Sequence, residues 1–165
     1  MKAVSAINKK IFTLPQLLAQ VASWRVTNKM VAFTNGCFDI FHEGHIFSLS
    51  EAAKEADYLI IGVNSDSSTR KLKGPERPVN HEHSRALLLA HLAIVDAVII
   101  FNEDTPKELI TAILPDVLVK GGDYMIEQIV GSKEVLDNGG RVVINPIVEG
   151  FSTTGIIKQI KTSYS

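Results

Sequence analysis

The chain has 165 residues, which is long enough for one domain with a hydrophobic core and short for two. Hydrophobic residues make up 45% and charged residues 21%, as in globular proteins, and a net charge of −1 gives no reason to expect nucleic acid or membrane as a partner. Cys37 is the only cysteine, which excludes an internal disulfide and a paired-cysteine metal site. The sequence has neither a signal-peptide pattern nor an apolar run of roughly 20 residues, so we expect a cytoplasmic protein.

Residues 1–29 are predicted to form a helical extension ahead of a main domain that covers residues 30–165. Apolar residues recur there with helical spacing: Leu14, Leu17, Leu18, Val21 and Trp24. Pro15 would lie in the first turn, where a missing backbone N–H costs nothing. We expect this helix to pack on the main domain.

From residue 30 onward, short apolar runs alternate with helical patterns. Five runs are predicted to be strands, at residues 31–34, 58–64, 97–101, 117–120 and 141–145. Helices are predicted at residues 44–57, 83–93, 132–138 and 154–161, with one more that opens at Thr105-Pro106 and is capped by Thr105. Residues 64–77 are predicted to be a loop. The alternation predicts an α/β, Rossmann-like fold: a parallel five-stranded sheet with helices on both faces.

The segment from Asn35 to His45 carries the main functional signal, because it follows a buried strand and precedes a helix. Gly36 allows a tight turn, and Gly44 leaves space for a phosphate. If the helix begins here, His42 and His45 share one face beside its positive N-terminus, which suits an anion whose charge grows in a transition state. Two partly buried histidines with ordinary hydrogen bonds are one alternative. A zinc site is another, although no third ligand is obvious.

Three further segments follow strands and could bind a phosphorylated ligand. Four cations cluster in the loop after the second strand, where they could hold phosphates or simply be solvated: Arg70, Lys71, Lys73 and Arg77. The glycine pair of residues 120–124 permits close approach of a base or ribose, although the segment could be a plain capped turn. Ser152, Thr153 and Thr154 precede the last helix, where hydroxyls either cap the helix or bind phosphates.

Taken together, these segments resemble the nucleotidyltransferase superfamily of the H-x-G-H type, which contains cytidylyltransferases, pantetheine-phosphate adenylyltransferases and sugar-phosphate adenylyltransferases. The resemblance runs from about residue 30 to residue 161. Within this superfamily the chain is similar to the D-glycero-β-D-manno-heptose 1-phosphate adenylyltransferases, which make ADP-heptose for lipopolysaccharide. The similar strings are Thr34–Asp39, Leu72–Val79, Asp104–Pro106, Pro115–Tyr124 and Val148–Thr154.

The resemblance implies transfer of an adenylyl group from ATP to heptose 1-phosphate, with release of pyrophosphate. It implies these catalytic residues: His42, His45 and Lys73. The implied nucleotide contacts are Asn35, Gly36, Cys37, Phe38, Gly44, Lys120, Gly122, Asp123, Ser152, Thr153 and Thr154. The implied acceptor contacts are Lys71, Arg77 and Arg85.

The resemblance also implies Mg²⁺ bound mainly by triphosphate oxygens and water, with Asp39 the one carboxylate considered near it and no protein ligand assigned. A separate sugar kinase is expected upstream, and a homo-oligomer is left open.

Two other functions remain open at this point. The segment from Asn80 to Arg85 resembles glycerol-3-phosphate cytidylyltransferases, which use CTP. A function of a different class is a nucleotide-binding sensor domain without turnover. Release of pyrophosphate with each triphosphate and each acceptor would discriminate among the three.

Overall fold

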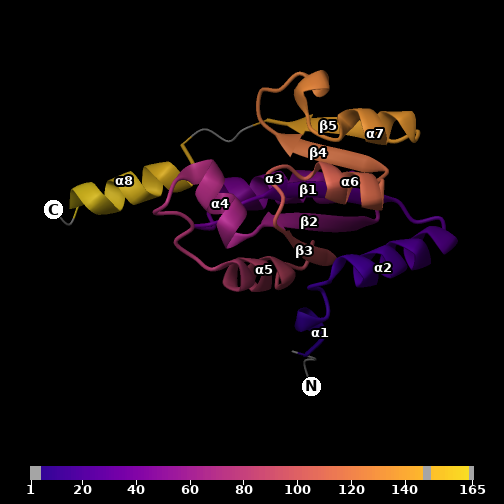
Figure 1. The fold of residues 1–165 in the computed structure, drawn as a ribbon, viewed down its shortest axis with the longest axis horizontal. Helices are drawn as coiled ribbons and strands as arrows, with labels where there is room; N and C mark the ends of the chain where they lie inside the picture. Colours follow the sequence, from indigo (N-terminus) through magenta and orange to yellow (C-terminus); the bar gives the residue numbers. More distant parts are fainter. Residues whose placement is uncertain (1–4, 147–149, 164–165) are drawn as a thin grey trace.

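The computed structural model describes residues 5–146 and 150–163, and a parallel five-stranded sheet lies at its centre (Figure 1). The strands are β1 (Val31–Gly36), β2 (Tyr58–Asn64), β3 (Ala97–Phe101), β4 (Val117–Gly121) and β5 (Arg141–Asn145). Their order is β3-β2-β1-β4-β5, and every neighbouring pair is parallel. The chain builds one half of the sheet outward from β1 and then returns to build the other, so the strand order switches between β1 and β4. The predicted Rossmann-like fold is confirmed.

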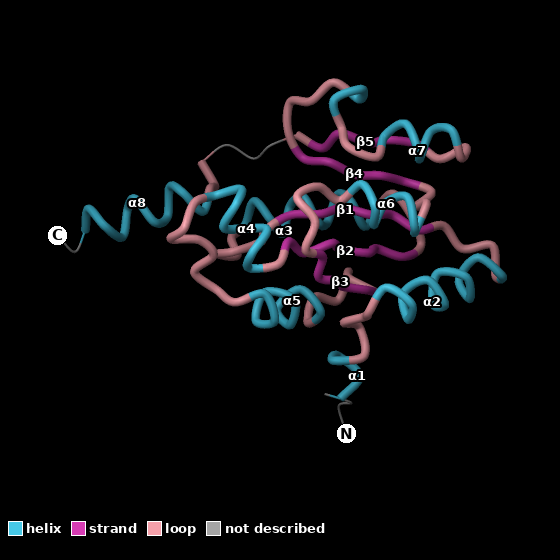
Figure 2. The backbone as a smooth tube through the Cα atoms, viewed as in Figure 1, coloured by secondary structure: helices cyan, strands magenta, loops and turns pink. Residues whose placement is uncertain are grey.

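Helices cover both faces of the sheet (Figure 2). They are α1 (Ser5–Asn8), α2 (Leu14–Val26), α3 (Glu43–Ala53), α4 (Asp66–Lys73), α5 (Glu82–Ala90), α6 (Lys107–Ile113), α7 (Ser132–Asp137) and α8 (Thr153–Ser163), with a 3₁₀ turn, η1 (Ile126–Gln128). Val31 and Phe33 point to the core under α2, α6 and α7, whereas Ala32 points to the core under α3 and α5. Burial on both faces explains why the strands are nearly continuous apolar runs.

The N-terminal helix α2 belongs to the same core as the strands. Leu17, Val21 and Trp24 are buried in the cluster that contains Phe33, and the Trp24 ring stacks on Tyr58 with 4.2 Å between ring centroids. The helix therefore packs on the sheet through its apolar stripe, as the spacing predicts. The division of the chain at residue 29 stays a prediction.

The segment after β2 differs from the prediction. Residues 66–73 form helix α4 rather than a loop, and the Ser65 hydroxyl caps it by accepting from the Ser68 N–H at 3.1 Å. Leu72 is the only large apolar residue in α4, so the helix has no apolar stripe that the sequence could reveal. As a result, three cations lie on the last turn of a helix: Arg70, Lys71 and Lys73.

Smaller differences concern the ends of elements. Helix α6 begins at Lys107 with Pro106 as its N-cap, one residue later than predicted, and the Thr105 side chain does not cap it. Helix α3 ends at Ala53 instead of residue 57. The short elements α1 and η1 were not predicted, because four and three residues are too few to show a period. None of the helices in the described ranges has the length and apolar character needed to cross a membrane.

Candidate active site

A cavity of about 600 Å³ opens at the carboxyl ends of β1, β2 and β4, next to the switch in strand order. Four chain segments meet there: the turn after β1 with the start of α3, the end of α4, the β4 loop, and the start of α8. The lining residues are Asn35, Gly36, Cys37, Phe38, His42, His45, Asn64, Leu72, Lys73, Arg77, Lys120, Tyr124, Phe151, Ser152, Thr153 and Thr154. Four of them were not predicted as ligand contacts: Asn64, Leu72, Tyr124 and Phe151. Each lies in or beside a segment that follows a strand, and this position in the sequence could have predicted them as ligand contacts.

Five of the residues implied by the resemblance do not line this cavity: Gly44, Lys71, Arg85, Gly122 and Asp123. The two glycines act through their neighbours instead. A Cβ on Gly44 would lie 3.0 Å from the Phe151 Cβ and 3.1 Å from the His42 Nδ1. Gly122 has a φ of +132°, and a Cβ there would lie 2.6 Å from the Tyr124 ring. The absence of a side chain at these positions lets Phe151 and Tyr124 reach the cavity wall.

His42 and His45 lie at the N-terminus of α3 with their rings stacked. His42 is the N-cap of this helix, and the two ring centroids are 3.8 Å apart. The His42 backbone N–H donates to the His45 Nδ1 at 3.3 Å. Because Nδ1 accepts this bond, neutral His45 carries its proton on Nε2, from which it can donate to a ligand.

Both imidazoles are held in their neutral forms. Burial, together with the neighbouring His42, lowers the pKa of His45 to about 4, and burial also lowers the pKa of His42. Within the described residues, the His42 Nδ1 is buried and has no hydrogen-bond partner. A buried nitrogen of this kind is costly unless water or a ligand reaches it, so the histidine pair is a candidate ligand contact.

Lys120 brings a cation to the opposite wall of the cavity. Its Nζ donates to the Asn35 Oδ1 at 2.8 Å, and burial lowers the pKa of its ammonium group. No carboxylate pairs with Lys120 anywhere in residues 5–146 and 150–163. A half-buried cation with only an amide partner is stabilised when an anion binds beside it. Asn35, implied as a nucleotide contact, thus also orients Lys120.

Asp39 holds the loop after α4 in place. Its side chain is fully buried, and it accepts from the Arg77 Nε at 2.5 Å, the Val79 N–H at 2.8 Å and the Asn80 N–H at 2.9 Å. Burial alone would raise the pKa of Asp39, but these donors together lower it. Both carboxylate oxygens are therefore engaged in these bonds, and Asp39 does not line the cavity; a position of Asp39 near Mg²⁺ stays a prediction. No group of three or more metal-ligating side chains occurs in the part of the chain that the structure describes.

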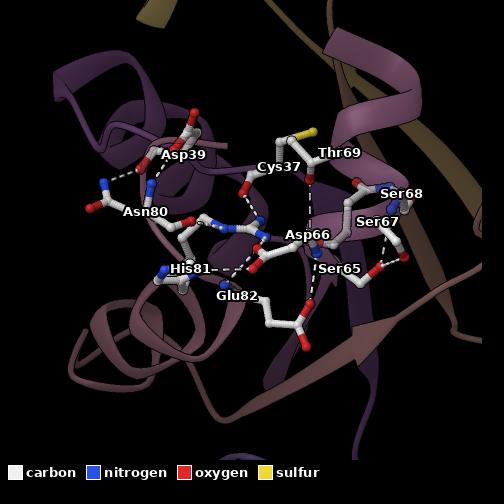
Figure 3. A network of polar contacts seen from close by, with 12 residues as sticks. Cys37, Asp39, Ser65, Asp66, Ser67, Ser68, Thr69, Asn80, His81 and Glu82 are labelled. Carbon is white, nitrogen blue, oxygen red and sulfur yellow. Dashed lines mark hydrogen bonds and ion pairs between the residues drawn. The ribbon is translucent and has the colours of Figure 1, made fainter. Parts of the chain in front are cut away.

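Arg85 bonds to a polar network that joins α4, α5 and the turn after β1. Figure 3 labels the Arg85 partners Cys37, Asp66 and Asn80. Its side chain is buried and donates to the Cys37 carbonyl at 2.5 Å, the Asn80 carbonyl at 2.9 Å and the Asp66 Oδ1 at 2.9 Å. Asp66 and Glu82 also exchange hydrogen bonds between side chain and backbone at 2.6 and 2.8 Å. Arg85 thus holds in place the turn after β1, whose residue Cys37 lines the cavity. Lys71, in turn, pairs with Asp104 at 2.8 Å outside the cavity.

Residues 33–163 match the family model described as cytidylyltransferase-like. The chain belongs to this family. Its cavity, with a histidine pair at a helix N-terminus and cations across from it, is thus that of a cytidylyltransferase-like domain.

Curated relatives align with nearly the whole chain. The bifunctional protein HldE of Mesorhizobium japonicum is 55% identical over 141 residues, which is 86% of this chain and 28% of the relative. The protein of the same name from Rhodospirillum rubrum is 50% identical over 157 residues, which is 95% of this chain and 32% of the relative. This cytidylyltransferase-like chain therefore spans less than a third of the length of these relatives.

Two solved structures share the fold. The lipopolysaccharide core biosynthesis protein from Thermoplasma volcanium has a TM-score of 0.59 at 28% identity, over 73% of this chain and 97% of that protein. The pantoate-β-alanine ligase from Francisella tularensis has a TM-score of 0.60 at 15% identity, over 92% of this chain and 76% of the ligase. The second likeness bears on the fold alone.

Proposed function

We propose that the chain transfers the adenylyl group of ATP to D-glycero-β-D-manno-heptose 1-phosphate, giving ADP-heptose and pyrophosphate. The observation that carries the proposal is the convergence of a neutral histidine pair, Lys73 and Lys120 on one cavity at the switch in strand order. Family membership and the HldE relatives, which align with nearly the whole chain, support the resemblance in motifs to the heptose enzymes. Part of one of those motifs, Val148-Glu149, lies outside the described residues.

In the proposed reaction, an oxygen of the sugar phosphate attacks the α-phosphorus of ATP in line. A new P–O bond forms, and the bond between the α- and β-phosphates breaks, so pyrophosphate leaves with the electron pair. Such a reaction depends on positioning and on stabilisation of charge rather than on covalent chemistry by the protein. His42 and His45, at the α3 N-terminus, would stabilise the α-phosphate as its charge develops.

Cations would hold the phosphate of the acceptor, and hydroxyls would hold the leaving pyrophosphate. Lys73 and Arg77 would bind the phosphate of the acceptor, and the segment from Ser152 to Thr154 would bind the leaving pyrophosphate. The Ser152 hydroxyl accepts from the Gly155 N–H at 2.9 Å, and the Thr153 hydroxyl donates to the Ile40 carbonyl at 3.3 Å. The first bond caps the start of α8 and the second ties it to the turn after β1, and Ser152, Thr153 and Thr154 line the same cavity as the histidines.

The donor groups present are compatible with a magnesium ion that arrives with ATP. No carboxylate of the described residues lines the cavity, so Mg²⁺ would be held by triphosphate oxygens and water rather than by a protein cage. The ion would neutralise part of the triphosphate charge. The protein's own share is then the orientation of the two phosphorylated substrates.

The acceptor must already carry its phosphate, so we expect a sugar kinase to supply it. We place the reaction in the cytoplasm, where ATP is available. The segment from Asn80 to Arg85 resembles glycerol-3-phosphate cytidylyltransferases. The structure gives these residues another role, because Glu82 and Arg85 bond within the polar network next to the turn after β1. Their identities therefore carry little weight in the choice of acceptor.

The test is pyrophosphate release with ATP or CTP, each paired with heptose 1-phosphate or glycerol 3-phosphate, in the presence of Mg²⁺. We expect the highest kcat/KM for ATP with heptose 1-phosphate, because a site built for one base leaves buried polar groups unpaired with the other. A clear preference for CTP, or no turnover with any sugar 1-phosphate, would reject the proposed substrates. No turnover with any pair would favour a sensor domain.

A further inference from the structure

A second cavity of about 240 Å³ adjoins the first, and the two share a wall made by Lys120 and Tyr124. It lies between the loop after β3 and the loop after β4. Its lining residues are Asp104, Thr105, Pro106, Lys120, Tyr124, Gln128, Ile129 and Val130. A ligand that extends past this wall from the first cavity therefore enters the second.

Helix α4 links the two cavities on their other side. Lys73, at its end, lines the first cavity, and Lys71, two residues earlier, pairs with Asp104 of the second cavity at 2.8 Å. Helix α4 therefore contributes one lysine to the first cavity and one to the Asp104 ion pair beside the second, so its last turn lies near both.

The two cavities differ in chemistry. The first gathers cations and imidazoles, whereas the second has no imidazole, shares Lys120 with the first, and adds the Lys71-paired carboxylate of Asp104, the Thr105 hydroxyl, the Gln128 amide and an apolar wall of Pro106, Ile129 and Val130. A carboxylate repels a triphosphate but accepts hydrogen bonds from hydroxyl groups. The Gln128 Oε1 accepts from the Met125 N–H at 3.1 Å, so its NH₂ group is the part of the amide that can donate to a ligand. This set of groups suits an uncharged polyhydroxylated ring.

We propose that the second cavity is the subsite for the sugar ring of the acceptor, in which Asp104 and Gln128 bind ring or side-arm hydroxyls and Tyr124 packs against the carbon skeleton. The inference rests on the proposed function, which it deepens by assigning the residues that select the sugar. Gly122 contributes indirectly: its φ of +132° lets the Tyr124 ring lie against the backbone, at the boundary between the two cavities.

The test compares Asp104→Asn and Gln128→Ala with Glu103→Gln, a matched control one residue from Asp104 that does not line the second cavity. For each purified full chain we would measure the KM for heptose 1-phosphate at saturating ATP and, by calorimetry, the affinity for ATP alone. We expect the two cavity variants to raise the acceptor KM about tenfold or more, as for a lost hydrogen bond in a charged or well-packed site. The two cavity variants should keep the ATP affinity of the wild type. The control variant should match the wild type in both acceptor KM and ATP affinity.

Two results would overturn the subsite. If ATP affinity fell and the acceptor KM stayed constant, the second cavity would hold the nucleoside. If neither constant changed, the cavity would hold no part of either substrate. Both results require an active wild-type protein, so they are distinct from failure of the proposed function itself, in which the wild type releases no pyrophosphate with ATP and a sugar 1-phosphate.

Discussion

At the scale of one residue, the surroundings of His45 suit the anion contact that we propose for it. Its Nδ1 is occupied by the His42 backbone N–H, and its ring is stacked on His42. Burial holds its pKa near 4, so the imidazole is neutral at physiological pH and donates through Nε2. The ring can therefore stabilise developing charge without the cost of burying a permanent cation in an empty cavity.

The depressed pKa of His45 predicts a pH dependence of stability. Its folded-state pKa of about 4 lies below the ordinary histidine pKa of 6.5, so between these values the unfolded chain binds a proton that the folded chain does not. The contribution to stability is full above the unfolded pKa and is lost as pH falls toward the folded one. His45→Gln should therefore flatten the decline in unfolding free energy over this window, as measured by urea unfolding. The exposed His83→Gln should not, and equal slopes for all three proteins would show that His45 is not buried as a neutral ring.

Lys73 should act on the acceptor more than on the nucleotide. It lies at the end of α4, next to the loop that carries Arg77, whereas the start of α8 provides the hydroxyls of the cavity. Lys73→Ala should raise the KM for the phosphorylated acceptor and leave ATP affinity near that of the wild type. Lys54→Ala, which removes a lysine on α3 that pairs with Glu51, is the control. Loss of ATP affinity at constant acceptor KM would mean that the two halves of the site are exchanged.

At the scale of secondary structure, the strands were predictable and the contacts between loops were not. Burial on both faces requires apolar runs, and β2, β3 and β5 begin and end at the predicted residues. Helix α4 escaped prediction because it buries Ser68 and Thr69 instead of an apolar stripe. Local spacing reveals a turn or a helix start, which is why the histidine motif and the Ser-Thr segment were found.

The network behind the cavity depends on long-range pairings. Asp39 reaches Asn80, 41 residues away, and Arg85 reaches the Cys37 carbonyl, 48 residues away. No periodicity connects such residues, so no pattern in the sequence indicates these bonds. The resemblance assigned Arg85 to the acceptor, and the structure surrounds it with two backbone carbonyls and Asp66.

Removing the Asp39 carboxylate tests what holds the loop after α4. Asp39→Ala leaves the Arg77 guanidinium and two backbone N–H groups without their acceptor in a buried position. We expect a loss of about 3–5 kcal/mol in unfolding free energy, as for a broken buried pair. The acceptor KM should also rise, because Arg77 lines the cavity. Asp57→Ala, which breaks a more exposed pair with Lys29, should cost much less. Equal losses in the two variants would contradict this role for Asp39.

For the whole molecule, the strand order explains why the groups assigned to the two proposed substrates meet in one cavity. The crossovers leave β1 and β4 side by side at the centre of the sheet, and the loops that follow them diverge toward opposite faces. The turn after β1 presents the helix N-terminus of α3, and the β4 loop presents Lys120 and Tyr124. The end of α4 and the start of α8 also line this cavity. Donor and acceptor phosphates can therefore meet between His45, Lys73 and Lys120.

The most direct test of this account measures kcat and ATP affinity for His42→Ala and His45→Ala, with His83→Ala as a control for an exposed histidine on α5. If the imidazoles stabilise charge that develops at phosphorus, each substitution at the cavity should lower kcat about 10²–10³-fold, as for loss of one preorganised donor, and leave ATP affinity largely intact. Near-normal turnover in both cavity variants would contradict the assignment of this cavity as the site of nucleotidyl transfer.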